Sequence, residues 1–554
     1  MRRAFAFLLL AALLFAPFKI NSAAAEYDPI VRIGLAYGNN ALPAAKLINV
    51  AGQAEGYEFG FFDAEGQFTP LHSTDERSLA VLKDKPMWVT QGEDYYDAQP
   101  ASYAYSIGPY HLQIDGAYFQ GRDDAVLAAD EAERRGYRAF PAYVNGEYVV
   151  RIGEFLSEDR ARERQPQAEL DLGYSLRICG QSATCCTVTV LGSDRILFEL
   201  DSEGKHLGIM PRSTATWFKG YQYAGGFEYR RISANDITVI NVISMTDYIK
   251  GVLPAEVGTN WPIEAQKAQA ICAKCYTLNS LGKHKSQGFD LCNTTDCQAY
   301  SGLSRATEMS DRAVDEVYGI YATYNGEVAQ TYYHSSSGGY TEDAYNIWGS
   351  EVPYLKAVED KYLKHMVPYS VTVTLDDLTE ILRSKGYTAR RVKDYYVSRY
   401  SPVGNVLEVS FLLDNGEVLR MSGNRARTAI NRSAKGVTIR SHRYTISGGA
   451  GFYVNGSAAS QSIQSMYAIG AGGDVSQIGG TGRDVKVITG TGVKDADLSG
   501  GAAISSSYTV NGTGSGHNVG MSQWGAYDMA VEGFKYDEII KFYFTGVEVG
   551  YWSR

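Results

Sequence analysis

Short apolar runs separated by turn residues fill most of the first 250 residues, and this pattern constrains the fold more than any other feature. Runs such as VRIGLAY (31–37) and YEFGFFD (57–63) predict a β-rich segment over residues 26–98. Further runs between residues 173 and 250 predict antiparallel strands. The chain has 554 residues, of which 45% are hydrophobic, so it can bury the cores of two to four domains and is not a disordered protein.

Residues 103–157 combine strands with one helix. YAYSIGPYHLQIDGAY alternates apolar and polar residues, a charged helix is expected over 122–135, and AFPAYVNGEYVVRIGEF predicts two strands around an Asn145-Gly146 turn. This β-α-β-β pattern resembles the sporulation-related repeat (SPOR) domain, a small module that binds peptide-free glycan strands. The resemblance implies a SPOR-like glycan-binding module over residues 99–166, although an unrelated α/β module would show the same pattern.

The first 25 residues have the pattern of an export signal. Arg2 and Arg3 precede an apolar run from Ala4 to Phe18, and small residues follow up to Ala25. Because this run of about 15 residues is shorter than the roughly 20 that a spanning helix needs, a cleaved secretory signal is favoured over a membrane anchor. We therefore expect an extracytoplasmic protein, either secreted or associated with the cell wall or membrane after export.

Net charge and cysteine content narrow the possible partners. The net charge of −10 differs from the basic surface of a nucleic-acid-binding protein, so we expect no nucleic-acid partner.

In an exported chain cysteines can form disulfides, but an odd number leaves at least one unpaired or bound to another group. The seven cysteines are Cys179, Cys185, Cys186, Cys272, Cys275, Cys292 and Cys297.

The segment YIKGVLPAEVGTNWPIEAQKAQAICAKCYTL (248–278) has the most chemical content. Asn260 and Pro262 are typical helix-start residues, and Cys272 and Cys275 fall on the apolar face of the helix that follows. Glu256 is expected in a turn before this helix, among apolar neighbours. Desolvation there favours the protonated carboxyl that a general acid requires, but the residues alone favour the alternative, an exposed loop glutamate.

Four blocks in this order resemble the stage II sporulation protein D family, which includes the amidase enhancers. They are YIKGVLPAEVG…EAQKAQAICAKCYTL, FDLCNTTDCQAYSG (289–302), AQTYYHSSSGGYTEDAYNIWG (329–349) with PYLKAVED (353–360), and GSGHNVGMSQWGAYDMAVEGFKYDEIIKFYFTGVEV (514–549). The resemblance implies a mixed α/β catalytic domain with antiparallel strands over residues 167–554, with a Gly/Ser-rich insertion at about 448–516. We therefore expect an α+β multidomain fold.

Family members of this type are lytic transglycosylases that cut glycan strands stripped of their stem peptides. The resemblance implies that Glu256 protonates the bridging oxygen and then accepts the proton of the muramic C6 hydroxyl. The product is a 1,6-anhydro-N-acetylmuramic end, and no water is consumed. An ordinary hydrolase would need a second carboxylate, for which Glu264, Asp343 and Asp528 are candidates.

Nine further residues of the matched blocks are implied to bind substrate. They are Lys274, Tyr276, Ser337, Gly338, Gly339, His517, Ser522, Gln523 and Trp524. Lys274 stands where the family usually has Arg, and Asn518 stands where it usually has Gly. A tight turn is the alternative role of Ser337–Gly339, and a structural role is the alternative for His517.

The reaction requires no cofactor, but some family members hold a structural zinc with Cys and His ligands at the loop that contains Cys292 and Cys297. Asp296 replaces the His of those members, so His284 or His334 would complete the site. A Cys292–Cys297 disulfide is the alternative.

The expected partners are peptidoglycan glycan strands and a cell-wall amidase, in sporulation or wall remodelling of a spore-forming or related Gram-positive bacterium. Two non-enzymatic functions compete with the transglycosylase. One is an enhancer of a separate amidase, and the other is a scaffold that recruits a partner hydrolase.

Overall fold

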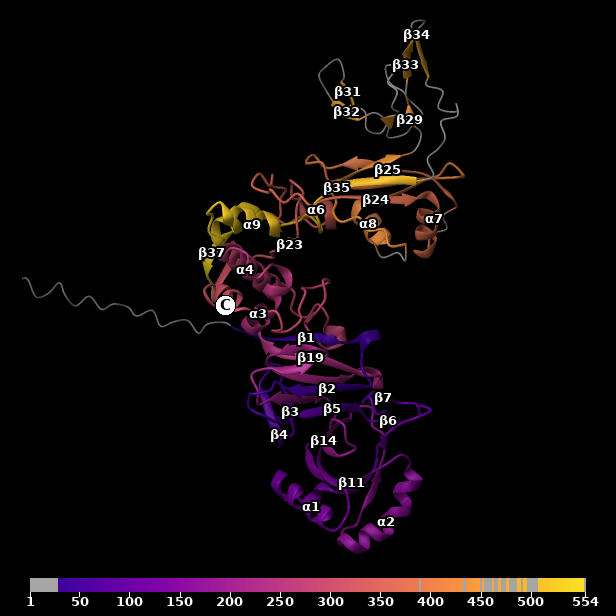
Figure 1. Cartoon of the computed structure of the whole chain (residues 1–554), viewed down its shortest axis with the longest axis vertical. Helices are drawn as coiled ribbons and strands as arrows, with labels where there is room; N and C mark the ends of the chain where they lie inside the picture. The colour runs from indigo at the N-terminus through magenta and orange to yellow at the C-terminus, as the bar shows by residue number, and fades with distance from the viewer. Residues whose placement is uncertain are drawn as a thin grey trace, which may run out of the picture.

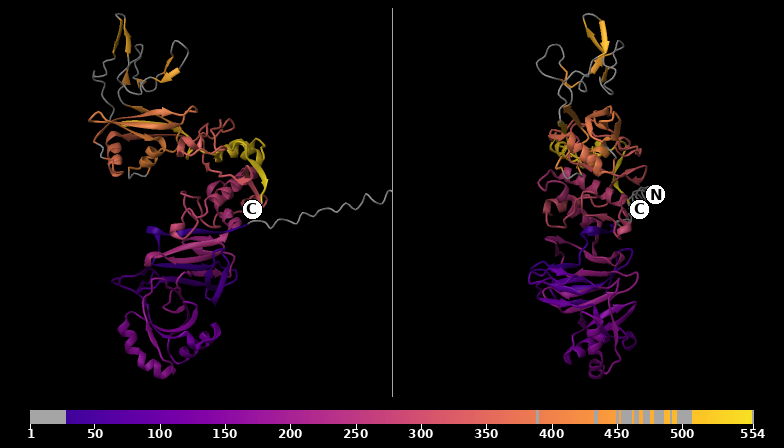
Figure 2. Two further views of the ribbon diagram at one scale, coloured as in Figure 1. Left: turned by 180° about the vertical axis from the view of Figure 1, so that it is seen from behind. Right: turned by 90° about the vertical axis from the view of Figure 1, so that its right-hand side faces the viewer.

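The computed structural model describes residues 28–387, 390–431, 435–448 and 507–552, together with the backbone of short strands between 451 and 495. These parts form an elongated molecule with the helices of residues 122–172 at one end and residues 368–448 toward the other (Figures 1 and 2). The expected export signal and most of the expected Gly/Ser-rich insertion lie outside the described residues. Within the described ranges, no helix is both long and apolar enough to cross a membrane.

A seven-stranded sheet joins the N-terminal segment to strands more than 150 residues later in the chain. In spatial order it contains β20 (Leu291–Cys292), β1 (Ile30–Ala36), β19 (Ile237–Ser244), β18 (Gly226–Arg231), β15 (Leu207–Pro211), β3 (Tyr57–Phe62) and β4 (Phe68–Thr74). β1 pairs antiparallel with β19, so that Val31 lies opposite Ile243. The β-rich segment at residues 26–98 therefore shares this sheet with strands of the region expected to be catalytic.

A second, ten-stranded sheet lies beside the first. Its order is β12 (Arg177–Cys179), β9 (Tyr110–Ile114), β11 (Glu147–Phe155), β10 (Ala139–Val144), β14 (Ile196–Asp201), β13 (Cys186–Val190), β5 (Ser78–Lys83), β2 (Ala44–Asn49), β16 (Thr216–Phe218) and β17 (Tyr221–Tyr223). A small sheet of β7 (Tyr95–Tyr96), β6 (Met87–Val89) and β8 (Tyr105–Ile107) adjoins it. Most neighbouring strands run antiparallel, while β10 and β14 are parallel.

The region compared with a SPOR domain contains β9, α1 (Arg122–Arg134), β10 and β11, followed by α2 (Glu158–Leu172) and β12. The two helices pack on one face of these strands, and the opposite face carries His111, Gln113 and Arg151, which are also buried. β10 continues the sheet into β14. These strands therefore belong to a larger sheet, and neither of their faces is open to a polymer. Whether residues 99–166 form a glycan-binding module stays a prediction.

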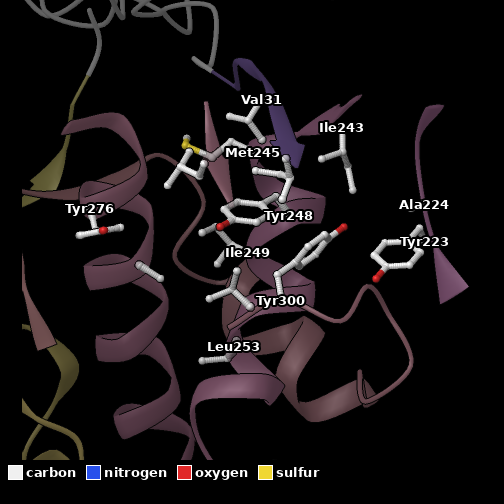
Figure 3. Packing of buried hydrophobic residues seen from close by; sticks show 14 of the residues in the cluster. Val31, Tyr223, Ala224, Ile243, Met245, Tyr248, Ile249, Leu253, Tyr276 and Tyr300 are labelled. Atoms are coloured by element: carbon white, nitrogen blue, oxygen red, sulfur yellow. The ribbon is translucent and has the colours of Figure 1, made fainter. Parts of the chain in front are cut away.

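Helices cover the β1–β19 side of the seven-stranded sheet. α3 (Met245–Glu256) and α4 (Ile263–Asn279) pack with α5 (Glu308–Asp315), α9 (Gln523–Val531) and α10 (Tyr536–Tyr543). Tyr248, Ile249 and Leu253 of α3 pack in one core with Val31 and Ile243 (Figure 3). The helix predicted after Pro262 is confirmed, with Pro262 as its N-cap.

Short strands and one short helix complete the helical region. They are β21 (Ile320–Tyr324), β22 (Glu327–Val328), β23 (Tyr333–His334), α6 (Ala344–Trp348), β36 (Met521–Ser522) and β37 (Glu548–Tyr551). β23 and β36 pair in parallel, with His334 opposite Ser522. This pair brings the third and fourth motif blocks together.

Residues 368–448 and 507–513 form a subdomain with a hydrophobic core of its own. One sheet contains β24 (Pro368–Thr374), β35 (Ser507–Thr513) and β28 (Tyr444–Gly448), and another contains β25 (Val392–Tyr400), β26 (Val406–Leu413) and β27 (Val418–Ser422). α7 (Leu375–Ser384) and α8 (Gly423–Asn431) pack on these strands. The folded subdomain thus begins well before the Gly/Ser-rich stretch expected at 448–516.

Three strand pairs lie between residues 451 and 495. They are β29 (Gly451–Phe452) with β30 (Gln461–Ser462), β31 (Tyr467–Ile469) with β32 (Val475–Gln477), and β33 (Lys486–Thr489) with β34 (Gly492–Asp495).

Candidate functional site

A groove of about 820 Å³ lies beside the C-terminal end of α3. Its wall is made of polar and aromatic side chains from all four motif blocks. The lining residues are Glu256, Tyr276, Asn279, Ser280, Leu281, Gly282, Lys283, Thr295, Asp296, Cys297, Gln330, Tyr332, Tyr333, His334, Ser335, Trp348, Gly516, His517 and Gln523. A groove of this size, lined by aromatic rings and a few polar groups, can hold a chain of sugar rings.

Glu256 is the last residue of α3, and not part of a separate turn as the sequence suggested. The helix continues through Pro254 because its ring removes only one backbone donor near the helix end. The Ala299 N–H donates to Glu256 Oε1 at 2.7 Å, and Gln523 Nε2 lies 3.5 Å from Oε2. The carboxyl group is therefore held by the second and fourth motif blocks while it lines the groove.

The pKa of Glu256 is raised above its ordinary value because burial penalises the ionised carboxylate. The hydrogen bonds from Ala299 and Gln523 oppose this shift but do not cancel it. No cation is among the causes of the shift. Glu256 is thus an unpaired, half-buried carboxyl group whose acid form is favoured.

Among the described residues that line the groove, the only other carboxylate is Asp296, which forms an ion pair with Lys283. The three alternative carboxylates are engaged elsewhere. Glu264 accepts the backbone N–H of Tyr536, Asp343 that of Ala357, and Asp528 that of Lys364. The described groove therefore offers no free second carboxylate beside Glu256.

An aromatic wall lines the groove. The Tyr332 and Trp348 rings lie 4.5 Å apart, Trp348 and His517 lie 5.2 Å apart, and Tyr276 and Tyr332 lie 5.9 Å apart. Of these residues, the sequence singled out Tyr276 and His517. Tyr332 and Trp348 are inside the third motif block, and their aromatic character was the signal that could have found them.

Tyr333 was also missed and stands close to the acid. Its hydroxyl donates to Gln298 Oε1 at 2.7 Å, and the Glu256 charge contributes to a raised Tyr333 pKa. Gln298 in turn donates to Thr277 Oγ1 at 3.0 Å. Tyr333 thereby ties β23 to the loop that supplies the Ala299 N–H.

His517 lines the groove as a neutral ring, since burial lowers its pKa to about 4. The Val519 N–H donates to His517 Nδ1 at 3.1 Å, and the ring also hydrogen-bonds to the Tyr333 backbone. Both contacts fix the orientation of the imidazole. This geometry suits a contact surface better than a proton donor at neutral pH.

Asn518 adopts a φ of 64°, in the left-handed region that Gly and Asn favour. Replacing the usual Gly therefore keeps the loop conformation. The side chain also donates to the Ser337 carbonyl at 2.7 Å and accepts the His442 N–H at 3.1 Å. It links the groove loop to the inserted subdomain.

Six residues expected to bind substrate do not line the groove. Lys274 is buried, donates to the Val317 carbonyl at 2.7 Å and lies over the Tyr321 ring. Trp524 stacks on His365, with ring centroids 4.3 Å apart. The other four are Ser337, Gly338, Gly339 and Ser522.

These four residues brace the groove from behind. Ser337 Oγ donates to Asp360 at 2.6 Å, and Ser522 caps α9 by accepting the Gly525 N–H. Gly338 has a φ of 67°, and a Cβ there would lie 2.6 Å from the Thr513 carbonyl. Their geometry matches the tight-turn alternative.

His284, Cys292, Asp296 and Cys297 form a cluster at one end of the groove. One ligand atom of each lies within 4.8 Å of all the others. Cys297 Sγ is 3.3 Å from His284 Nε2, and His284 Nε2 is 3.6 Å from Asp296 Oδ2. This donor set suits a tetrahedral zinc ion. His334, the other histidine considered, is not a member of the cluster.

Comparison with known proteins gives one family match and several relatives. Residues 233–324 match the family described as stage II sporulation protein. An uncharacterized protein of Brachyspira hyodysenteriae is 29% identical over 338 residues, which cover 60% of this chain and 74% of that protein. The amidase enhancer of Bacillus subtilis is 28% identical over 305 residues, covering 54% of this chain and 39% of the relative. Stage II sporulation protein D of Bacillus subtilis is 26% identical over 322 residues, which cover 55% of this chain and 74% of that protein.

Proposed function

We propose that this chain, whose residues 233–324 match the stage II sporulation protein family, is a peptidoglycan lytic transglycosylase with Glu256 as its acid. The family match links the chain to a cell-wall role in sporulation. The transglycosylase activity and the preference for peptide-stripped strands belong to the proposal. The observation that supports it best is a carboxyl group with a raised pKa, with no cation among the causes of the shift, in the wall of a groove of about 820 Å³.

The proposed reaction uses one carboxyl group twice. Protonated Glu256 donates its proton to the oxygen that bridges two sugars, and the bond between that oxygen and the muramic C1 breaks. The C6 hydroxyl oxygen then bonds to C1, and its proton passes to the Glu256 carboxylate. The enzyme returns to its protonated form, and the product carries a 1,6-anhydro ring.

Hydrogen bonding around Glu256 supports this dual role. The Ala299 N–H binds Oε1 and stabilises the carboxylate formed after the first proton transfer. The long Gln523 contact leaves Oε2 with a weaker partner, so this oxygen is the better proton carrier. A hydrolase would need a second carboxylate at a defined separation, and Asp296 is already paired with Lys283.

The aromatic wall supports a sugar polymer as the substrate class. Tyr276, Tyr332 and Trp348 present ring faces and edges to the groove, and such surfaces stack on the apolar faces of pyranose rings. Neutral His517 extends this surface beside Gly516. A glycan strand can thus bind without a strongly charged groove.

The proposal includes a structural zinc at His284, Cys292, Asp296 and Cys297, whose donor atoms fit such an ion. When bound, zinc would brace the 292–299 loop and supply no acid or nucleophile. Cys297 is two residues from Ala299, whose N–H holds Glu256. The four side chains would therefore keep the acid in position, and a Cys292–Cys297 disulfide would brace the same loop in the alternative.

Digestion of purified peptide-stripped glycan strands tests the proposal. Mass spectrometry should find anhydro-muramic ends with the wild-type chain and none above background with Glu256→Gln. Glu264→Gln is the matched control, because it removes a nearby carboxyl group outside the groove and should retain activity. Ends that have gained water would replace the transglycosylase with a hydrolase.

A second function is favoured by the relative named amidase enhancer. In this alternative the groove binds glycan and the chain activates a cell-wall amidase without cutting the strand. The Glu256→Gln variant separates the two functions, since an enhancer would stimulate the amidase equally well with either residue. Both functions would place the protein outside the cytoplasm.

A further inference from the structure

A buried polar cluster lies in the ten-stranded sheet, and the groove chemistry makes no use of it. Its members are Asp84 after β5, His111 on β9, Arg151 on β11, Cys185 before β13 and Glu199 on β14. All five are at most 3% exposed. Burying this many ionisable groups is costly unless they pair with each other or bind an ion.

Three of these residues converge on one point. One ligand atom each of Asp84, Cys185 and Glu199 lies within 4.8 Å of the other two. Carboxylate oxygens and a cysteine sulfur are ligands that zinc accepts. An acidic pair beside one thiol would not by itself make a metal site.

His111 provides an independent indication of a metal site. Its Nδ1 hydrogen-bonds to the Gly153 carbonyl, which places the proton on Nδ1 in the neutral tautomer. Nε2 then presents a lone pair, is buried without a hydrogen-bond partner, and lies 3.4 Å from Glu199 Oε1. Metal-binding histidines characteristically donate their other ring N–H to a backbone carbonyl or carboxylate in this way.

Further hydrogen bonds hold the carboxylates of the cluster in position. Thr187 Oγ1 donates to Glu199 Oε1 at 2.7 Å, and the Ser182 N–H donates to Asp84 Oδ2 at 2.7 Å. Arg151 Nη1 donates to Glu199 Oε2 at 2.5 Å and lies 3.8 Å from Cys185 Sγ.

Arg151 has two more partners: its Nε donates to Gln113 Oε1 at 3.3 Å and its Nη2 lies 3.5 Å from Asp201 Oδ2. These bonds hold the guanidinium in place.

We propose that Asp84, Cys185 and Glu199 form a second metal site that takes a divalent ion of the zinc type, with His111 beside Glu199 as the further donor that would move toward the ion. The charges balance with a metal bound. The two carboxylates and the Cys185 thiolate supply three negative charges, and Arg151 and the ion supply three positive charges. The Cys185 thiol proton and the proton on His111 Nε2 leave to solvent when the metal binds, so His111 is neutral in the metal-bound form. The site ties β9, β14 and the segment before β13 to the β5–β6 turn.

Metal counting on the full chain tests this site apart from the groove. The double variant Cys292→Ser/Cys297→Ser removes the donor set near Glu256 and should still contain about one zinc per chain by plasma mass spectrometry. Cobalt(II) substituted into this variant should show thiolate-to-metal charge-transfer absorption. X-ray absorption should find one sulfur among nitrogen and oxygen ligands. This result does not depend on glycan cleavage.

Cys185 and Cys186 provide a matched pair of variants. Both are buried, they are adjacent, and only Cys185 belongs to the cluster. In the double-variant background, Cys185→Ser should reduce zinc content at least tenfold and abolish the charge-transfer band, whereas Cys186→Ser should retain both. Loss of zinc in both variants would indicate unfolding of the sheet and overturn the assignment.

Two further outcomes would also overturn it. One is a double variant that contains no zinc and takes up neither zinc nor cobalt while remaining folded by circular dichroism. The other is a Cys179–Cys185 disulfide found by peptide mass spectrometry in the protein as isolated, since it would remove the thiolate ligand.

Discussion

Glu256 and Glu199 are two glutamates removed from water in the same chain, and their surroundings shift their pKa values in opposite directions. In the metal-free chain Glu199 lies beside Arg151 and protonated His111, whose positive charges, with hydrogen bonds, outweigh desolvation and lower its pKa. Glu256 has no cationic partner, so desolvation prevails and its pKa rises. Burial alone therefore does not decide the protonation state of a carboxyl group, and the neighbouring charges do. One glutamate is suited to proton transfer and the other to ion pairing or metal binding.

The largest expected effect is on catalysis. Glu256→Gln should lower the rate of anhydro-end formation by about 10²- to 10⁴-fold, the usual contribution of a general acid–base residue. Its free energy of unfolding should change little, because the amide is nearly isosteric and burial already disfavours the ionised carboxylate in the wild type. Initial rates and urea unfolding measured on the same preparation check both statements. A rate loss below tenfold would assign the acid to another residue.

The second-largest expected effect is on the stability of the folded chain. Glu199→Gln should lower the free energy of unfolding by about 3–5 kcal/mol, because Arg151 would remain buried without its main counter-ion. Urea unfolding in the presence of a chelator excludes any contribution from metal. Glu203→Gln, at an exposed position four residues later, should change stability by less than about 0.5 kcal/mol.

The pH dependence of this loss follows from the lowered pKa of Glu199. A depressed pKa stabilises the folded chain above the unfolded value near 4.5, and this contribution disappears as the pH falls through the folded value. The difference between wild type and Glu199→Gln should therefore be full at neutral pH and shrink in acid. A difference that grows below pH 4.5 would contradict the ion-pair assignment.

Glu256 should show the opposite pH dependence. Because its pKa is raised and the acid form is needed, the cleavage rate should fall as the pH increases through that pKa. Its contribution to stability is likewise present below about pH 4.5 and is lost as the pH rises through the folded value.

Gln523 lowers the Glu256 pKa by its hydrogen bond, so Gln523→Met should move the falling limb of the rate profile to higher pH. Rate profiles of the two proteins measure this shift, and a shift to lower pH would contradict the assigned contact.

The smallest expected effect concerns Lys274. The sequence grouped it with the substrate-binding residues, but its amine lies in the core, where burial lowers its pKa to about 8. Lys274→Met should leave KM for glycan strands within about twofold and reduce stability by about 1 kcal/mol, the contribution of one hydrogen bond. A KM increase of tenfold or more would place Lys274 at the substrate.

Sequence reasoning proposed Glu256 as the acid and predicted the helix after it, because these features depend on contiguous residues. Of the residues predicted to bind substrate, Tyr276, His517 and Gln523 line the groove with Glu256. Lys274 and Trp524 were grouped with them because a motif does not reveal which side of a helix faces the substrate. α4 is buried on almost all sides, and its weak periodicity left the direction of Lys274 undetermined.

The sequence by itself revealed the resemblance to the stage II sporulation protein D family and made Glu256 the candidate acid. Both conclusions rest on short stretches whose residue types and spacing are visible along the chain. Tertiary structure alone decided that β1 pairs with β19 and that Asp84, His111, Cys185 and Glu199 meet in one buried cluster. Such contacts join residues up to about 200 positions apart through sheet register, which is set by the packing of whole strands and leaves no local pattern in the sequence.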